Sequence, residues 1–203
     1  MNRVFLLIIS LALWGCTAED SALPILGEKV VDPDSGELRH YQAPAFQLTN
    51  QYGQPVSEQS FVGKIQVVDF FFTSCPTICP TMTNHMKAVA ESFTEEDRLA
   101  LISCTIDPRK DTPERLRKYA EERELQYQNW FFLTGYRDHI FEIAKDYKVR
   151  AFDDSDAHNP NNLIHDGTFV LVDGNRHIRG YYNGLDRADT DRLIGDVEKL
   201  LRE

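Results

Sequence analysis

Two cysteines separated by three residues are the part of this chain whose spacing most directly permits chemistry. Cys75 and Cys79 enclose Pro-Thr-Ile and follow the apolar run 67–72, which has the character of a buried strand. Pro80 suits the first turn of a helix, so the sequence predicts both thiols at a strand-to-helix junction. The dipole and free N–H groups of a helix start favour thiolate over thiol, and we expect two low-pKa sulfurs. Such a pair can close a disulfide or hold a soft metal ion such as Cu(I).

The N-terminus indicates the compartment in which these thiols work. A short basic start, Met1-Asn2-Arg3, precedes the apolar stretch 4–13 and then Gly15-Cys16, which is typical of a secretory signal with a bacterial lipobox. The apolar stretch is shorter than the roughly 20 residues that a membrane-spanning helix needs. We therefore expect a lipoprotein signal peptide over residues 1–15 and lipidation at Cys16. The chain would then be a membrane-anchored lipoprotein facing the periplasm or the cell exterior.

Composition predicts one globular domain with an ordinary apolar core. Hydrophobic residues make up 42% of the chain, and its length fits a single domain, which we place at residues 44–203 after a lipidated tether and N-terminal hairpin over residues 16–43. The formal net charge of −10 and the scattered basic residues argue against a nucleic-acid partner. Of the four cysteines only Cys104 remains after the lipid site and the pair, and its apolar surroundings predict an inert buried thiol.

Hydrophobic periodicity predicts strands that alternate with helices. A hairpin is expected over residues 29–41. The other expected strands are 46–49, 65–72, 99–106, 130–133, 168–172 and 177–182, and the expected helices are one through 82–93, one opening at 111–114, 136–147 and about 187–201. This order predicts an α/β thioredoxin-like fold, with a central mixed β-sheet flanked by helices and an extra N-terminal β-hairpin. The cysteine pair would lie at the carboxyl end of the central strand, and the loop 159–167, which contains His165, would return beside it.

Three motifs, in this order, resemble those of the Sco/SenC family, thioredoxin-like copper proteins of cytochrome c oxidase assembly. Residues 72–80 match the CxxxC motif, residues 106–114 the DPxxDTPE segment and residues 164–169 the histidine loop. The resemblance spans about residues 40–203. It implies copper ligation by Cys75, Cys79 and His165, with Asp107 as a polar neighbour of the site. It also implies a copper-containing subunit of cytochrome c oxidase as partner, together with another copper chaperone or a thiol reductase.

The donor types support this ligand set on chemical grounds. Two thiolates and one imidazole suit Cu(I), and also Cu(II) if a water or a carboxylate adds a bond. Zinc would accept the same donors, although the general affinity order favours copper. Met82 and Met86 are also soft donors, but they lie on the apolar stripe of a helix and are predicted to be core. The other histidines, including His85 and His177, are expected to stay outside the site.

Two classes of function remain open from the sequence. One is a copper-binding assembly factor, which loads the dinuclear copper site of an oxidase subunit or reduces the cysteines of that subunit with Cys75 and Cys79 as the redox pair. The other is an enzyme, either a thioredoxin-like thiol–disulfide reductase or a peroxiredoxin. A peroxiredoxin carries a threonine three residues before its cysteine, whereas Thr73 stands two residues before Cys75. A general dithiol reductase would more often carry CxxC and a cis-proline where this chain offers His165.

Overall fold

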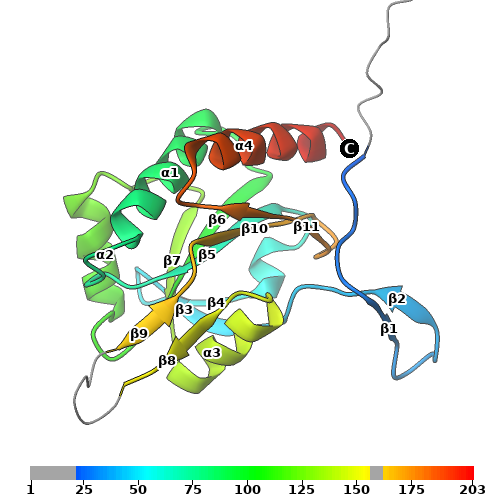
Figure 1. The fold of residues 1–203 in the computed structure, drawn as a ribbon, viewed down its shortest axis with the longest axis horizontal. Coiled ribbons are helices and arrows are strands. Elements are labelled where there is room, and N and C mark those ends of the chain that lie inside the picture. The colour runs from blue at the N-terminus through cyan, green and yellow to red at the C-terminus, as the bar shows by residue number, and fades with distance from the viewer. Residues whose placement is uncertain (1–21, 156–161) are drawn as a thin grey trace, which may run out of the picture.

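A computed structural model describes residues 22–155 and 162–203 of the chain. The predicted signal peptide and the lipidation site Cys16 lie outside the described residues. Among the helices of the described part, none combines the length and the apolar character needed to cross a membrane. The described residues form layered α/β structure around one large sheet (Figure 1).

The large sheet contains seven strands in the order β11-β10-β5-β6-β7-β3-β4. Its parallel centre consists of β5 (Ile65–Phe71), β6 (Leu99–Thr105) and β7 (Trp130–Thr134). The antiparallel strands on either side are β10 (Thr168–Val172), β11 (Ile178–Asn183), β3 (Gln47–Asn50) and β4 (Pro55–Ser57). Every residue of β5 and β6 is buried, as expected for central strands covered on both faces. The predicted mixed sheet is therefore present.

Helices cover both faces of this sheet (Figure 1). The helices α1 (Cys79–Ser92), α2 (Pro113–Glu122) and α4 (Arg187–Arg202) pack on one face, and α3 (Arg137–Asp146) packs on the other. Alternate residues of β5 divide between the two cores: Val67 joins the core under α1, α2 and α4, and Val68 joins the core under α3. Met82 and Met86 are fully buried in the first core, which confirms that they are packing residues.

The helix start predicted near residue 112 is confirmed in detail. Thr112 is the N-cap of α2, and its hydroxyl accepts a 3.3 Å hydrogen bond from the backbone N–H of Arg115. Pro113 occupies the first helical position, where its missing N–H costs nothing. The helix therefore begins at a fixed point, directly after Asp111.

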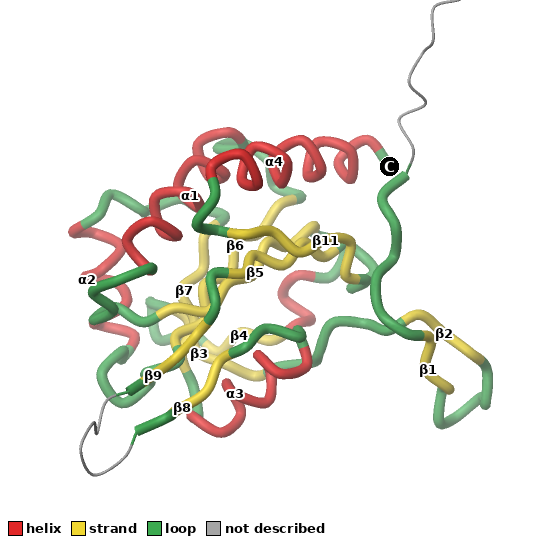
Figure 2. The backbone as a smooth tube through the Cα atoms, in the orientation of Figure 1, coloured by secondary structure: helices red, strands yellow, loops and turns green. Residues whose placement is uncertain are grey.

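The predicted N-terminal hairpin is also confirmed, by the antiparallel pairing of β1 (Lys29–Val31) with β2 (Leu38–His40). The sequence did not predict β4, the 3₁₀ helix η1 (Glu58–Phe61), β8 (Ala151–Asp153) or β9 (Leu163–His165). The strands β8 and β9 form a separate antiparallel ribbon near α3 (Figure 2). His165, expected in a loop, is therefore the last residue of a strand, and residues 156–161 of that loop lie outside the described part of the chain.

Candidate metal centre

The two cysteines stand on either side of the junction between β5 and α1. After Phe71, the last residue of β5, a tight turn is closed by a 3.2 Å hydrogen bond from the Cys75 N–H to the Phe72 carbonyl oxygen. Cys79 is the first residue of α1 and Pro80 the second. Both side chains are buried, Cys79 at 1% exposure and Cys75 at 8%. The predicted strand-to-helix placement is therefore correct, and Cys75 is the more accessible sulfur.

His165 reaches the cysteines from β9. Its Nε2 atom lies 3.1 Å from the Sγ atom of Cys79, and its Nδ1 atom lies 2.9 Å from the carbonyl oxygen of Asp166. A carbonyl oxygen can only accept, so this contact assigns the proton of the neutral ring to Nδ1. The Nε2 lone pair is then directed at the sulfur, in the state in which histidine ligates metals. The ring forms a T-shaped contact with Phe72, with ring centroids 5.8 Å apart.

These three side chains form a compact donor group. The Sγ atoms of Cys75 and Cys79 and a ring nitrogen of His165 all lie within 4.8 Å of one another. Within residues 22–155 and 162–203 this is the one such group of three or more His, Cys, Asp or Glu donors. The structure thus brings together all three donor residues that the family resemblance implied. Two sulfurs and one imidazole form a soft set that matches Cu(I) better than Mg²⁺ or Ca²⁺.

The environment makes the two thiols unequal. The contact with Cys79 holds the pKa of Cys75 well below its usual range. The same contact, together with burial, raises the pKa of Cys79. The sequence-based expectation of two low-pKa sulfurs is therefore wrong for Cys79, because two negative charges this close together in a buried site oppose each other. Without a metal, this asymmetry favours ionisation of Cys75 and retention of the proton by Cys79.

Asp69 is a buried acid next to this site that the sequence analysis missed. It lies on β5 at 3% exposure, and the Ser103 hydroxyl donates to it. Ser103 in turn accepts a 2.9 Å hydrogen bond from the indole N–H of Trp130. Burial raises the pKa of Asp69 to about 6, while the hydrogen bond from Ser103 opposes this shift. A carboxylate inside the apolar run 67–72 is itself an anomaly, and that signal could have identified Asp69.

Asp107 follows β6, the strand next to β5. Its carboxylate lies 3.4 Å from the Lys110 ammonium, and its backbone N–H donates a 3.0 Å hydrogen bond to the Thr105 hydroxyl. Its oxygens are not part of the compact donor group. The polar-neighbour role that the family resemblance implied for Asp107 stays a prediction.

The remaining candidate residues lie outside the donor group. Cys104 is buried in the core on the α3 side of the sheet, whereas Cys75 and Cys79 belong to the core on the other side. Burial raises the pKa of Cys104, which matches an unreactive thiol. The Nδ1 atom of His85 lies 2.8 Å from the Gly184 carbonyl oxygen, and His177 lies 3.5 Å from the Asp173 carboxylate.

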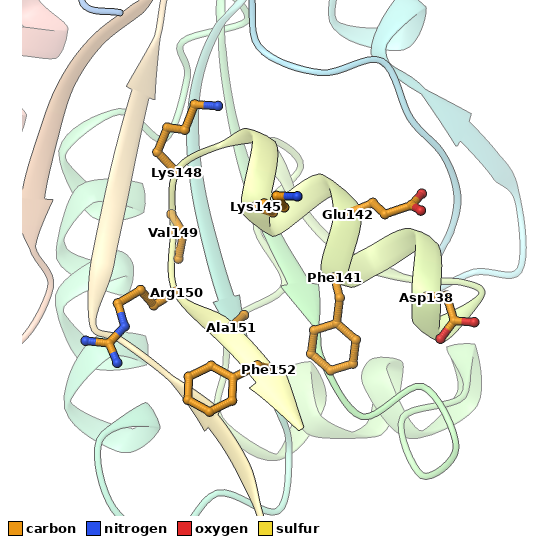
Figure 3. Close-up of a pocket in the computed structure, with 9 residues that line it drawn as sticks. All are labelled: Asp138, Phe141, Glu142, Lys145, Lys148, Val149, Arg150, Ala151 and Phe152. Carbon is orange, nitrogen blue, oxygen red and sulfur yellow. The ribbon is translucent and has the colours of Figure 1, made fainter. Parts of the chain in front are cut away.

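A groove of about 620 Å³ lies elsewhere, between α3 and β8 (Figure 3). Phe141 on α3 and Phe152 on β8 supply its apolar walls, and Lys148 and Arg150 lie toward one end. None of the three donor residues lines it. The metal centre is therefore a buried donor group rather than part of this groove.

Comparison with known proteins gives consistent matches. The SCO1/SenC family model matches residues 35–202. The crystal structure of a SCO1/SenC family lipoprotein from Bacillus anthracis is 31% identical with a TM-score of 0.71, over 79% of this chain and 95% of that one. BsSco is a member of the Sco family of cytochrome c oxidase assembly proteins, and a disulfide switch was identified in it. Its structure is 35% identical with a TM-score of 0.67, over 79% of this chain and 93% of that one. ScoI of Bradyrhizobium japonicum, solved with copper bound, is 25% identical with a TM-score of 0.63, over 74% of this chain and 98% of that one. These structural matches confirm the thioredoxin-like fold expected from the sequence.

Proposed function

This chain belongs to the SCO1/SenC family, and we propose that it binds copper as a cargo and assists assembly of the dinuclear copper site of a cytochrome c oxidase. The observation that carries the proposal is the group of two sulfurs and one imidazole nitrogen within 4.8 Å. The copper-bound Bradyrhizobium japonicum relative and the oxidase-assembly relative BsSco support it.

The residues present fit copper in both of its oxidation states. The Cys75 and Cys79 sulfurs would hold Cu(I), and the Nε2 atom of His165 adds the harder donor that Cu(II) requires. Metal binding requires Cys79 to lose its proton, because a thiolate rather than a thiol is the ligand. Loading with copper therefore releases the proton that the apo site retains on Cys79.

A second function, reduction of a disulfide in the oxidase subunit, is favoured by the low pKa of Cys75. The Cys75 thiolate would attack one sulfur of the partner's disulfide, and the other sulfur would leave as a thiolate. Cys79 would then lose its proton and attack the Cys75 sulfur, which releases the second partner thiolate. The protein ends as a Cys75–Cys79 disulfide, and the partner gains two electrons. The peroxiredoxin alternative has less support, since the Thr73 hydroxyl donates to Asp111 rather than toward Cys75.

We further propose that the domain acts outside the cytoplasm, tethered through a lipid on Cys16. The basic and apolar N-terminus followed by Gly15-Cys16 supports this proposal. The similarity to a SCO1/SenC lipoprotein of Bacillus anthracis adds to it. Tethering would keep the metal centre near membrane-bound partners.

Metal analysis tests the main proposal. The full chain, purified in detergent and reduced, is exposed to copper, desalted and analysed for metal; we expect one copper per chain. The matched control is the Cys75→Ser, Cys79→Ser double variant, which should retain none. A wild-type chain that retains no copper would exclude copper delivery. Parallel assays of disulfide reduction and peroxide consumption separate the second candidate from the peroxidase.

A further inference from the structure

We propose that Asp111 is a positioning residue that holds the turn before Cys75 and thereby fixes one sulfur of the metal centre. The proposal deepens the proposed function and rests on it. Asp111 lies within the second motif found in the sequence, but it is neither a helix cap nor one of the three donors. Its side chain is fully buried, at 0% exposure.

The contacts of Asp111 account for this burial. One carboxylate oxygen accepts a 2.9 Å hydrogen bond from the Thr73 N–H and a 2.5 Å hydrogen bond from the Thr105 hydroxyl. The other oxygen accepts a 2.6 Å hydrogen bond from the Thr73 hydroxyl. The Thr73 hydroxyl also accepts a 3.1 Å hydrogen bond from Nε of Arg115, on α2. A buried carboxylate persists only when its oxygens are satisfied in this way.

These bonds join the segment after β5, the end of β6 and the start of α2. Thr73 belongs to the turn that the Cys75 N–H closes on the Phe72 carbonyl. The Asp111 carboxylate therefore binds both the backbone N–H and the side-chain hydroxyl of Thr73, two residues before Cys75. Cys79 and His165 are positioned differently, by the first turn of α1 and by the β8–β9 ribbon. Loss of Asp111 should thus loosen Cys75 relative to the other two donors.

The consequence differs from that of an ordinary stabilising contact. A donor set binds metal tightly when the protein holds its geometry in advance, and groups that support a ligand from behind typically change metal affinity by about 10–100-fold. A disulfide forms more readily when its two sulfurs are already held together, because less chain entropy is lost on closure. One carboxylate should therefore affect both the copper affinity and the dithiol–disulfide equilibrium.

The experiment compares full-chain variants in detergent. Asp111→Ala removes all three acceptor contacts, and we expect its Cu(II) affinity to fall by about 10–100-fold, with a shifted sulfur-to-copper charge-transfer band. Asp111→Asn should recover most of the affinity, because an amide can accept from the Thr73 N–H and donate to the Thr73 hydroxyl. Without copper, the equilibrium constant for forming the Cys75–Cys79 disulfide against glutathione should fall in Asp111→Ala.

Asp196→Ala is the matched control, since Asp196 is a buried carboxylate on α4 that accepts hydrogen bonds from Tyr182 and Lys199. It should lose stability while retaining the copper affinity and the absorption band. Wild-type affinity and band in folded Asp111→Ala, or an equal copper defect in Asp196→Ala, would overturn the inference. If Asp111→Ala does not fold, Thr73→Val provides the test. An unchanged sulfur-to-copper absorption band together with an unchanged disulfide equilibrium in Thr73→Val would overturn the inference. A wild-type chain that binds no copper would remove the proposed function, while the disulfide equilibrium would still decide the role of Asp111.

Discussion

Asp69 and Ser103 occupy paired positions on the parallel strands β5 and β6, and the Ser103 hydroxyl donates a 2.5 Å hydrogen bond to the Asp69 carboxyl. The bond compensates only part of the cost of burial, because burial still raises the pKa of Asp69 to about 6. An unfolded chain would titrate this group near its ordinary value of about 3.9. Folding therefore favours the protonated form of Asp69.

This relationship predicts a dependence of stability on pH. The stabilisation that protonated Asp69 gives to the folded state is fully present below about pH 4. It is lost as pH rises through about 6, because Asp69 then ionises in the folded protein as well as in the unfolded chain. Up to about 3 kcal/mol of unfolding free energy should be lost over that interval. Asp69→Asn should remove this loss, so the stability difference between variant and wild type should grow from pH 4 to pH 7. Urea unfolding of the metal-free chains across this range checks it, and a constant difference would contradict the assigned pKa.

The position of His165 predicts a selective effect on Cu(II). His165→Ala removes the nitrogen donor but leaves two sulfurs, which can hold Cu(I) nearly linearly. We expect Cu(II) affinity to fall by at least about 100-fold, the upper end of the effect of supporting groups, and Cu(I) affinity to fall much less. Titration with each copper state, followed by the sulfur-to-copper absorption, measures both. The matched controls His85→Ala and His177→Ala should behave as wild type, and equal Cu(II) affinity in His165→Ala would remove it from the site.

A third prediction links the redox state of the cysteines to copper binding. The same sulfurs form either the metal site or a disulfide, so the oxidised protein should bind no copper and the reduced protein one per chain. Thiol trapping combined with metal analysis tests this. Cys104→Ser should change neither result, since Cys104 lies on the other side of the sheet. A Cys75–Cys79 disulfide in protein that still holds stoichiometric copper is the outcome that would refute the linkage.

A fourth prediction concerns the N-terminus. If Cys16 receives the lipid, Cys16→Ser should yield an unlipidated precursor that is not cleaved between residues 15 and 16. The reason is that lipidation precedes cleavage in the maturation of bacterial lipoproteins. Intact mass and detergent partitioning of the two chains measure the change. Wild type should partition with detergent and carry the mass of an acylated chain starting at Cys16. An identical lipidated mass in the variant would count against this lipidation site.

The sequence predicted what depends on local pattern and on motif. The buried strand before Cys75 and the proline-led start of α2 follow from residue type and spacing, and the structure confirms both. The three donors were implied by the motif resemblance, and the structure brings their side chains together. The sequence did not predict β8 and β9, because strands of three residues have too little periodicity to distinguish them from a loop. The raised pKa of Cys79 was also missed, since it depends on a neighbouring sulfur and on burial rather than on the helix start alone.

The two-stranded ribbon has a consequence for local opening of the protein. The residue pairs Ala151–His165, Phe152–Ile164 and Asp153–Leu163 belong to a sheet separate from the seven-stranded one. We therefore expect His165 to withdraw by local unfolding of this ribbon, at a free-energy cost below that of global unfolding. Cys75 and Cys79 are joined instead to β5 and α1, at the centre of the cooperative core. We thus expect the amide hydrogens of the ribbon to exchange with solvent faster than those of β5, so that the nitrogen donor can depart while both sulfurs stay in place.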